Sequence, residues 1–232
     1  MCFSAQASFA AGAALLPAGA YCMSSALRKS PRMALLAFIP LAFSVQQLAE
    51  GLVWRGLEEG NSLLVQNASV LFLFFAIVFW PLWIPLSLIP LARGRKSGAI
   101  LAALTVISLA WLWLYYPLAT DPGRWLTTRI DHHSIRYEYD DLPGFQVTPH
   151  QIWRMAYLLS ICLPLIVCRR GGSGGKLSIL GGLLVAGLFL MSYLVFWYAF
   201  TSVWCFFAAI LSLVLCGVFY QLPQTTRAQG AS

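Results

Sequence analysis

The stretch SLLVQNASVLFLFFAIVFWPLWIPLSLIPLA, at residues 62–92, contains no charged side chain. A helix of about 20 apolar residues is long enough to cross the hydrocarbon core of a membrane. This stretch exceeds one straight crossing, and Pro81, Pro85 and Pro90 are expected to kink its second half. It therefore predicts a kinked transmembrane helix.

The rest of the chain repeats this composition. Of its 232 residues, 59% are hydrophobic and 10% are charged, whereas soluble domains carry about a quarter charged residues. We predict an all-α membrane protein in which residues 1–221 form a single domain of seven transmembrane helices and residues 222–232 form a cytoplasmic tail. The expected helices cover residues 3–27, 33–54, 62–92, 98–118, 149–169, 177–199 and 202–220.

The basic residues predict the orientation of these helices. The net charge of +7 does not indicate a nucleic-acid partner, because the Lys and Arg residues lie in loops and not on one basic face. Cytoplasmic loops of membrane proteins are enriched in Lys and Arg, which favours an outer N-terminus and an inner C-terminus here. This orientation places ten of the 15 basic residues inside: Arg28, Lys29, Arg32, Arg93, Arg95, Lys96, Arg169, Arg170, Lys176 and Arg227.

Residues 120–149 form the one long loop, which this orientation places outside. Residues 134–139 alternate apolar and polar side chains, residues 140–144 have the composition of a turn, and residues 145–147 resume the alternation. This pattern predicts a small extracytoplasmic β-hairpin that lies over the helix ends. Its inward face is expected to carry Ile135, Tyr137 and Tyr139, with His133 on the same side.

Three segments resemble a known family. These are the opening Met1-Cys-Phe-Ser-Ala5, the segment QQLAEGLVW at residues 46–54 and the segment SVWCFFAA at residues 202–209. The chain resembles a family of uncharacterised bacterial multi-pass membrane proteins that begin Met-Cys-Phe-Ser-Ala. This resemblance implies location in the bacterial inner membrane and brings no established activity.

Polar residues occur within the second expected helix. Gln46, Gln47, Glu50 and Trp54 have the spacing of one helical face. An ionisable side chain inside a membrane is costly, and it indicates a functional site by default. We expect Glu50 to act as a general base or metal ligand at the floor of an outward-facing pocket covered by the hairpin, with Gln46 and Gln47 binding the ligand. The alternative is a structural carboxyl group that joins helices.

A metal site could form around Glu50. His133, His150 and Cys2 all lie toward the outer side, and a mixed set of histidine, thiolate and carboxylate ligands suits zinc. The alternatives are exposed loop histidines and a Cys2 side chain that packs as a small residue. Trp54, Trp153 and Trp204 are expected to contact a ligand, although tryptophans also mark the membrane interface.

Two classes of function remain open. One is a metal-dependent membrane enzyme that acts on a lipid-like or small periplasmic substrate. The other is a non-enzymatic transporter, channel or sensor in which Glu50 holds a cation or proton. Membrane lipids are the expected partners in both cases.

Overall fold

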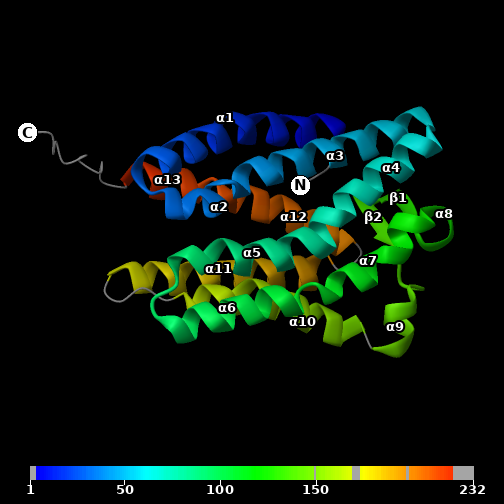
Figure 1. The fold of residues 1–232 in the computed structure, drawn as a ribbon. Helices are drawn as coiled ribbons and strands as arrows, with labels where there is room; N and C mark the ends of the chain where they lie inside the picture. Colours follow the sequence, from blue (N-terminus) through cyan, green and yellow to red (C-terminus); the bar gives the residue numbers. More distant parts are fainter. Residues whose placement is uncertain (1–3, 149, 169–172, 197–198, 222–232) are drawn as a thin grey trace, which may run out of the picture.

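The computed structural model describes residues 4–148, 150–168, 173–196 and 199–221 and is built almost entirely of helices (Figure 1). The first part contains α1 (Ala5–Lys29), η1 (Pro31–Met33), α2 (Ala34–Ala37), α3 (Ile39–Glu59), α4 (Ser62–Leu73), η2 (Phe74–Phe79), α5 (Trp80–Leu88), η3 (Ile89–Leu91), α6 (Arg95–Ile107) and α7 (Ala110–Thr120). The second part contains α8 (Pro122–Trp125), β1 (Thr127–Asp131), β2 (Ser134–Glu138), α9 (Pro143–Val147), α10 (His150–Val167), α11 (Ser173–Val195), α12 (Phe200–Ser212) and α13 (Val214–Gln221).

Within these described residues, five helical stretches are long and apolar enough to cross a membrane. They are Ala5–Lys29, Pro31–Glu59, Ser62–Leu91, Arg95–Thr120 and Phe200–Gln221, and two shorter apolar helices cover Gln151–Val167 and Gly182–Val195. Many large apolar side chains on these helices are exposed, such as Val106, Leu183 and Leu194. The chain is therefore a helical membrane protein, and these side chains are suited to contact with membrane lipids.

The proline-rich stretch is not one regular α-helix, although Pro85 lies within α5 without an interruption. A π-helical segment, η2, precedes Pro81, and a 3-10 turn, η3, contains Pro90. A proline ring clashes with the preceding helical turn and removes a backbone donor, so irregular turns gather around such residues.

Close packing of α1 on α3 depends on small residues. The Ser44 hydroxyl on α3 donates to the Gly12 carbonyl on α1 over 2.7 Å. A Cβ atom at Gly12 would lie 2.8 Å from Leu48 Cγ, which is too close for two carbon atoms. Glycine therefore lets the two backbones approach each other, as in other membrane helix pairs.

The two ends of the molecule differ. The β-hairpin, α8 and α9 gather at one end, and the last helix, α13, ends at the other (Figure 1). Lys29, at the end of α1, lies at this second end because its Nζ donates to the Phe219 and Tyr220 carbonyl oxygens over 3.2 and 3.3 Å. A cation beside the last carbonyls of a helix is favourable because the helix dipole is negative there.

The hairpin pairs different residues from those that the sequence predicted. Its strands are β1 and β2, with Ile130 opposite Ile135 and Asp131 opposite Ser134. Residues 145–147 belong to the short helix α9 and are not a strand, so that part of the prediction is wrong. Pro143 cannot donate to a strand ladder and instead starts a helical turn, whereas residues 127–131 can pair through a two-residue loop.

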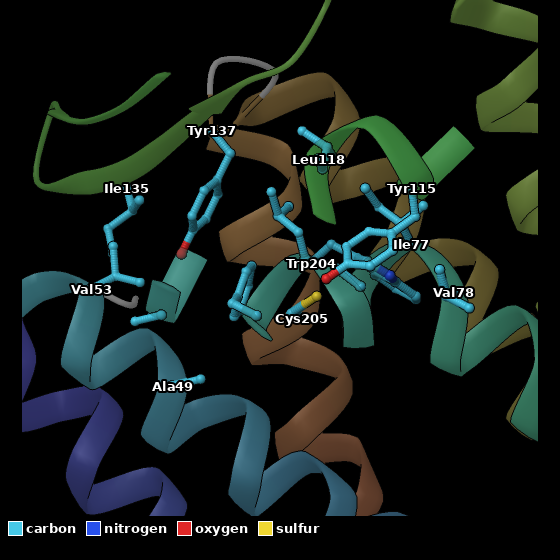
Figure 2. Close-up of a cluster of buried hydrophobic side chains, with 14 of the residues drawn as sticks. Ala49, Val53, Ile77, Val78, Tyr115, Leu118, Ile135, Tyr137, Trp204 and Cys205 are labelled. Atoms are coloured by element: carbon cyan, nitrogen blue, oxygen red, sulfur yellow. The ribbon is translucent and has the colours of Figure 1, made fainter. Parts of the chain in front are cut away.

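The inward face of the hairpin is confirmed. Ile135 and Tyr137 are buried, and both point from the hairpin toward the helices below (Figure 2). Tyr137 stacks on Phe72 of α4, with ring centroids 4.9 Å apart. These contacts join the hairpin to the main hydrophobic core.

Candidate functional site

The polar residues of α3 are fully enclosed by other helices. Gln46, Gln47 and Glu50 each have an exposed fraction of 0%. Glu50 Oε1 accepts a hydrogen bond from the Ser202 hydroxyl of α12 over 2.5 Å. Gln46 Oε1 accepts one from Trp80 Nε1 of α5 over 2.7 Å. The three side chains therefore form a buried polar row, Gln46–Glu50, that links α3 to two other helices.

Part of this buried polar row has no partner among the described residues. Neither Nε2 nor Oε1 of Gln47 forms a hydrogen bond there. The same holds for Nε1 of Trp54, which lies two turns further along the same face of α3. Buried amide and indole groups normally find a protein or water partner, because leaving one unpaired costs roughly 1–3 kcal/mol.

The two loop histidines lie at the tip of the hairpin, and both are exposed. His132 and His133 form its two-residue loop, and their backbone φ angles are 45° and 60°. A type I′ turn requires positive φ at both central residues. His132 Nδ1 lies 2.6 Å from Asp131 Oδ1, which directs this ring along the strand.

The expected inward position of His133 is therefore wrong, and His133 is not brought to the buried Glu50. The alternation of a strand stops where the chain turns, so its parity does not extend to the turn residues. Among the residues that the structure describes, no three His, Cys, Asp or Glu side chains gather as a metal site would require. Cys2 and the His150 side chain lie outside the described part, so a zinc site that includes them stays a prediction.

A cavity of about 190 Å³ lies beneath the hairpin. Its apolar wall includes Ile77, Trp111, Tyr157, Phe189 and Trp204, which come from five different helical elements. Tyr137 of the hairpin and Trp204 of α12 both line the cavity, and Figure 2 shows them within the cluster of buried hydrophobic side chains. Pockets for drug-sized ligands have volumes of about 300–1,000 Å³, so this cavity suits a small molecule or one part of a larger one.

The rim of the cavity is charged. Arg136, Glu138, Asp140 and Arg154 all line it. Glu138 Oε1 accepts from Arg129 over 2.6 Å and from Arg136 over 2.9 Å, and Arg136 also reaches Asp131 over 3.3 Å. These contacts form an ion-pair network on the hairpin that holds β1 and β2 together at the rim.

Arg154 differs from the other rim residues. Its guanidinium lies over the ring of Tyr193 on α11, 5.0 Å from the ring centroid. None of the salt bridges found within the described ranges includes Arg154. The rim therefore contains a cation that an aromatic ring positions and no described carboxylate neutralises.

A hydrogen bond connects the loop to the helix bundle at this rim. The Tyr139 hydroxyl lies 3.1 Å from Thr201 Oγ1 at the start of α12, and both residues line the cavity. Burial raises the pKa of the Tyr139 hydroxyl. The hydroxyl therefore keeps its proton at neutral pH and can hydrogen-bond to Thr201 or to a ligand.

The predicted ligand-binding residues are divided between two places. Trp153 and Trp204 line the cavity, and Trp153 Nε1 donates to the Gly144 carbonyl of α9 over 3.3 Å. Trp54 and the buried polar row are not among the residues that line this cavity, whose lining below the rim is mainly aromatic. Their role in ligand binding stays a prediction. Sequence reasoning also missed Arg154, although its place between Trp153 and Tyr157 was a usable signal.

A comparison with protein families gives one match. The model of a family of unknown function, DUF6629, matches residues 1–230. No curated protein and no solved structure matches the chain. Because the family model spans nearly the whole sequence, the chain belongs to the DUF6629 family.

Proposed function

We propose that the chain crosses the membrane seven times, with its N-terminus outside and its C-terminus inside, in the inner membrane of a bacterium. The shorter apolar helices Gln151–Val167 and Gly182–Val195 would complete the seven crossings. The basic residues Arg93, Arg95 and Lys96 and the Lys29–Tyr220 contact support an inner position for the end opposite the hairpin. The bacterial membrane is supported by the family resemblance.

Cysteine labelling tests this orientation. Gln146 is exposed in α9, and Ser97 lies in the first turn of α6, after the basic cluster. A membrane-impermeant thiol reagent should label Gln146→Cys in intact cells and Ser97→Cys only after permeabilisation. The wild-type chain measures the background from its own six cysteines. The reverse pattern would place the hairpin inside and overturn the proposal.

We further propose that the protein is an outward-facing ligand-binding protein whose cavity under the hairpin is the binding site. The observation that carries this proposal is the pairing of an aromatic wall with a charged rim, built from the loop and from several helix ends. Binding sites in proteins are concave and mostly apolar, with a few well-placed polar groups. Neither a transporter nor an enzyme is favoured within this proposal.

A reporter cysteine in the cavity tests this use of the site. Thr201 lines the cavity, whereas Ala209 lies two turns further along α12 and is buried outside it. A small thiol reagent added from outside should modify Thr201→Cys well above background and leave Ala209→Cys unmodified. Compounds that occupy the cavity should then slow the modification of Thr201→Cys. A reagent that reaches neither cysteine, or a reporter that no compound protects, would contradict a ligand-binding cavity.

A further inference from the structure

The position of Arg154 bears on which ligands suit the cavity. Arg154 is in the second turn of α10, at the end that carries the hairpin, and its guanidinium lies on Tyr193. Its neighbours Ile152 and Met155 are 56% and 57% exposed, and Leu194, next to Tyr193, is 72% exposed. Apolar side chains exposed to this degree on a membrane helix face lipid. Arg154 therefore lies where the cavity and the lipid-facing surface of α10 and α11 meet.

The charges around Arg154 favour an anion. Glu138 is occupied by Arg129 and Arg136, so it contributes little negative potential to the cavity. Asp140 also lines the rim, but its side chain is exposed to water, which screens its charge. An arginine guanidinium has a planar fork of donors that matches phosphate and carboxylate groups. An anionic group is thus the natural partner for Arg154.

The wall of the cavity favours an apolar body behind that anion. Trp111, Tyr157, Phe189 and Trp204 surround the space below the rim. Tyr157 stacks on Phe189 with ring centroids 6.3 Å apart, and Phe189 contacts Trp204 at 5.2 Å. These rings hold one another in place, so the wall is a fixed apolar surface. A cavity of about 190 Å³ has room for part of an alkyl chain but not for a whole lipid.

We propose that this cavity binds an anionic amphiphile, an inference that rests on its proposed ligand-binding function. The phosphate or carboxylate of the ligand would contact Arg154, and the adjoining part of its apolar chain would lie on the aromatic wall. The ligand would enter from the outer leaflet, past the exposed apolar side chains of α10 and α11. Lipid headgroups and aromatic side chains share this interfacial depth, which suits entry from the side.

The experiment uses the full-length protein in phosphatidylcholine nanodiscs with the Thr201→Cys reporter. Dodecyl phosphate, dodecyltrimethylammonium, dodecyl maltoside and inorganic phosphate are compared for their ability to slow labelling of the reporter. We expect dodecyl phosphate to protect at a concentration at least tenfold lower than each of the other three. Equal protection by the three dodecyl compounds would overturn the anion preference while leaving the ligand-binding proposal intact. Equal protection by inorganic phosphate would show a site for free anions and overturn the amphiphile.

Arginine variants test the contact itself. Arg154→Gln should raise the concentration of dodecyl phosphate needed for protection at least tenfold. Arg154→Lys should raise this concentration less, because lysine keeps the positive charge. Arg124 is a matched control, because its guanidinium lies 4.5 Å from the ring centroid of Trp125 and it does not line the cavity. Arg124→Gln should leave protection unchanged. Equal losses in Arg154→Gln and Arg124→Gln would mean a general surface-charge effect and would overturn the assignment of Arg154.

Discussion

Two neighbouring residues of α12 belong to two different polar regions. Ser202 donates to Glu50 in the buried polar row, whereas Thr201 contacts Tyr139 at the rim of the cavity. Successive residues of a helix point about 100° apart, so adjacent positions can serve different surroundings. Glu50 and both glutamines are enclosed, while the rim residues lie beside an open cavity. Polar side chains therefore connect helices in one region and line a cavity in the other.

The largest expected effect lies in the enclosed region. Glu50→Ala removes the acceptor of a buried hydroxyl group and should lower the free energy of unfolding by about 1–3 kcal/mol. Glu50→Gln keeps a hydrogen-bond acceptor for Ser202 and should lower the free energy of unfolding by less. Unfolding in detergent measures both, and Glu58→Ala is the control, because Glu58 is exposed on the same helix. If Glu50→Gln keeps its stability but abolishes ligand protection of Thr201→Cys, Glu50 belongs to the functional site after all.

The next effect concerns the hydrogen bond between the loop and α12 at the rim of the cavity. Tyr139→Phe removes the hydroxyl that lies 3.1 Å from Thr201 Oγ1 and keeps the ring that stacks near Phe145. The loss of one such hydrogen bond should cost about 0.5–1.5 kcal/mol. Hydrogen exchange of residues 134–147 should speed up in this variant. Tyr220→Phe is the control, because Tyr220 is 76% exposed; similar exchange in both variants would mean that the Tyr139 contact does not hold the loop.

A stabilising change is expected at the hairpin tip. Asn-Gly is the preferred pair at a two-residue turn with positive φ, so His132→Asn with His133→Gly should stabilise the hairpin by about 0.5–1 kcal/mol. Reporter protection should stay the same, because neither histidine lines the cavity. Elemental analysis of both proteins adds a test of the metal hypothesis. Zinc bound to the wild-type chain and lost in this variant would show that at least one of the two loop histidines is a ligand.

The smallest effect is the pH dependence of the rim network. Contacts with His132 and Arg136 lower the pKa of the Asp131 carboxyl below its ordinary value of 3.8. A lowered folded-state pKa means that Asp131 stabilises the hairpin above about pH 3.8, and that this contribution is lost as the pH falls through the lower folded value. The methyl resonance of Ile135 should report this step. Asp131→Asn should lack the step, and an unchanged step in that variant would assign it to another group.

Much of the fold could be predicted from sequence because it depends on local composition. Apolar length predicted the five long membrane helices, and the prolines indicated that residues 62–92 do not form one regular helix. The alternation at Ile135 and Tyr137 predicted which face of the strand is buried. A lone acid in an apolar helix has to avoid lipid, so the direction in which Glu50 faces was also predictable.

Tertiary structure alone decided how these parts meet. Strand pairing joins residues 127–131 to residues 134–138, and the sequence pattern of β2 does not specify its partner. The cavity brings together side chains from helices far apart in the chain, and its charged rim depends on which arginines the carboxylates already occupy. The sequence by itself therefore determined a helical membrane protein with a buried acid and an inward-facing strand. The cavity arises only from contacts between residues distant in sequence, because no local sequence pattern specifies which side chains will lie together.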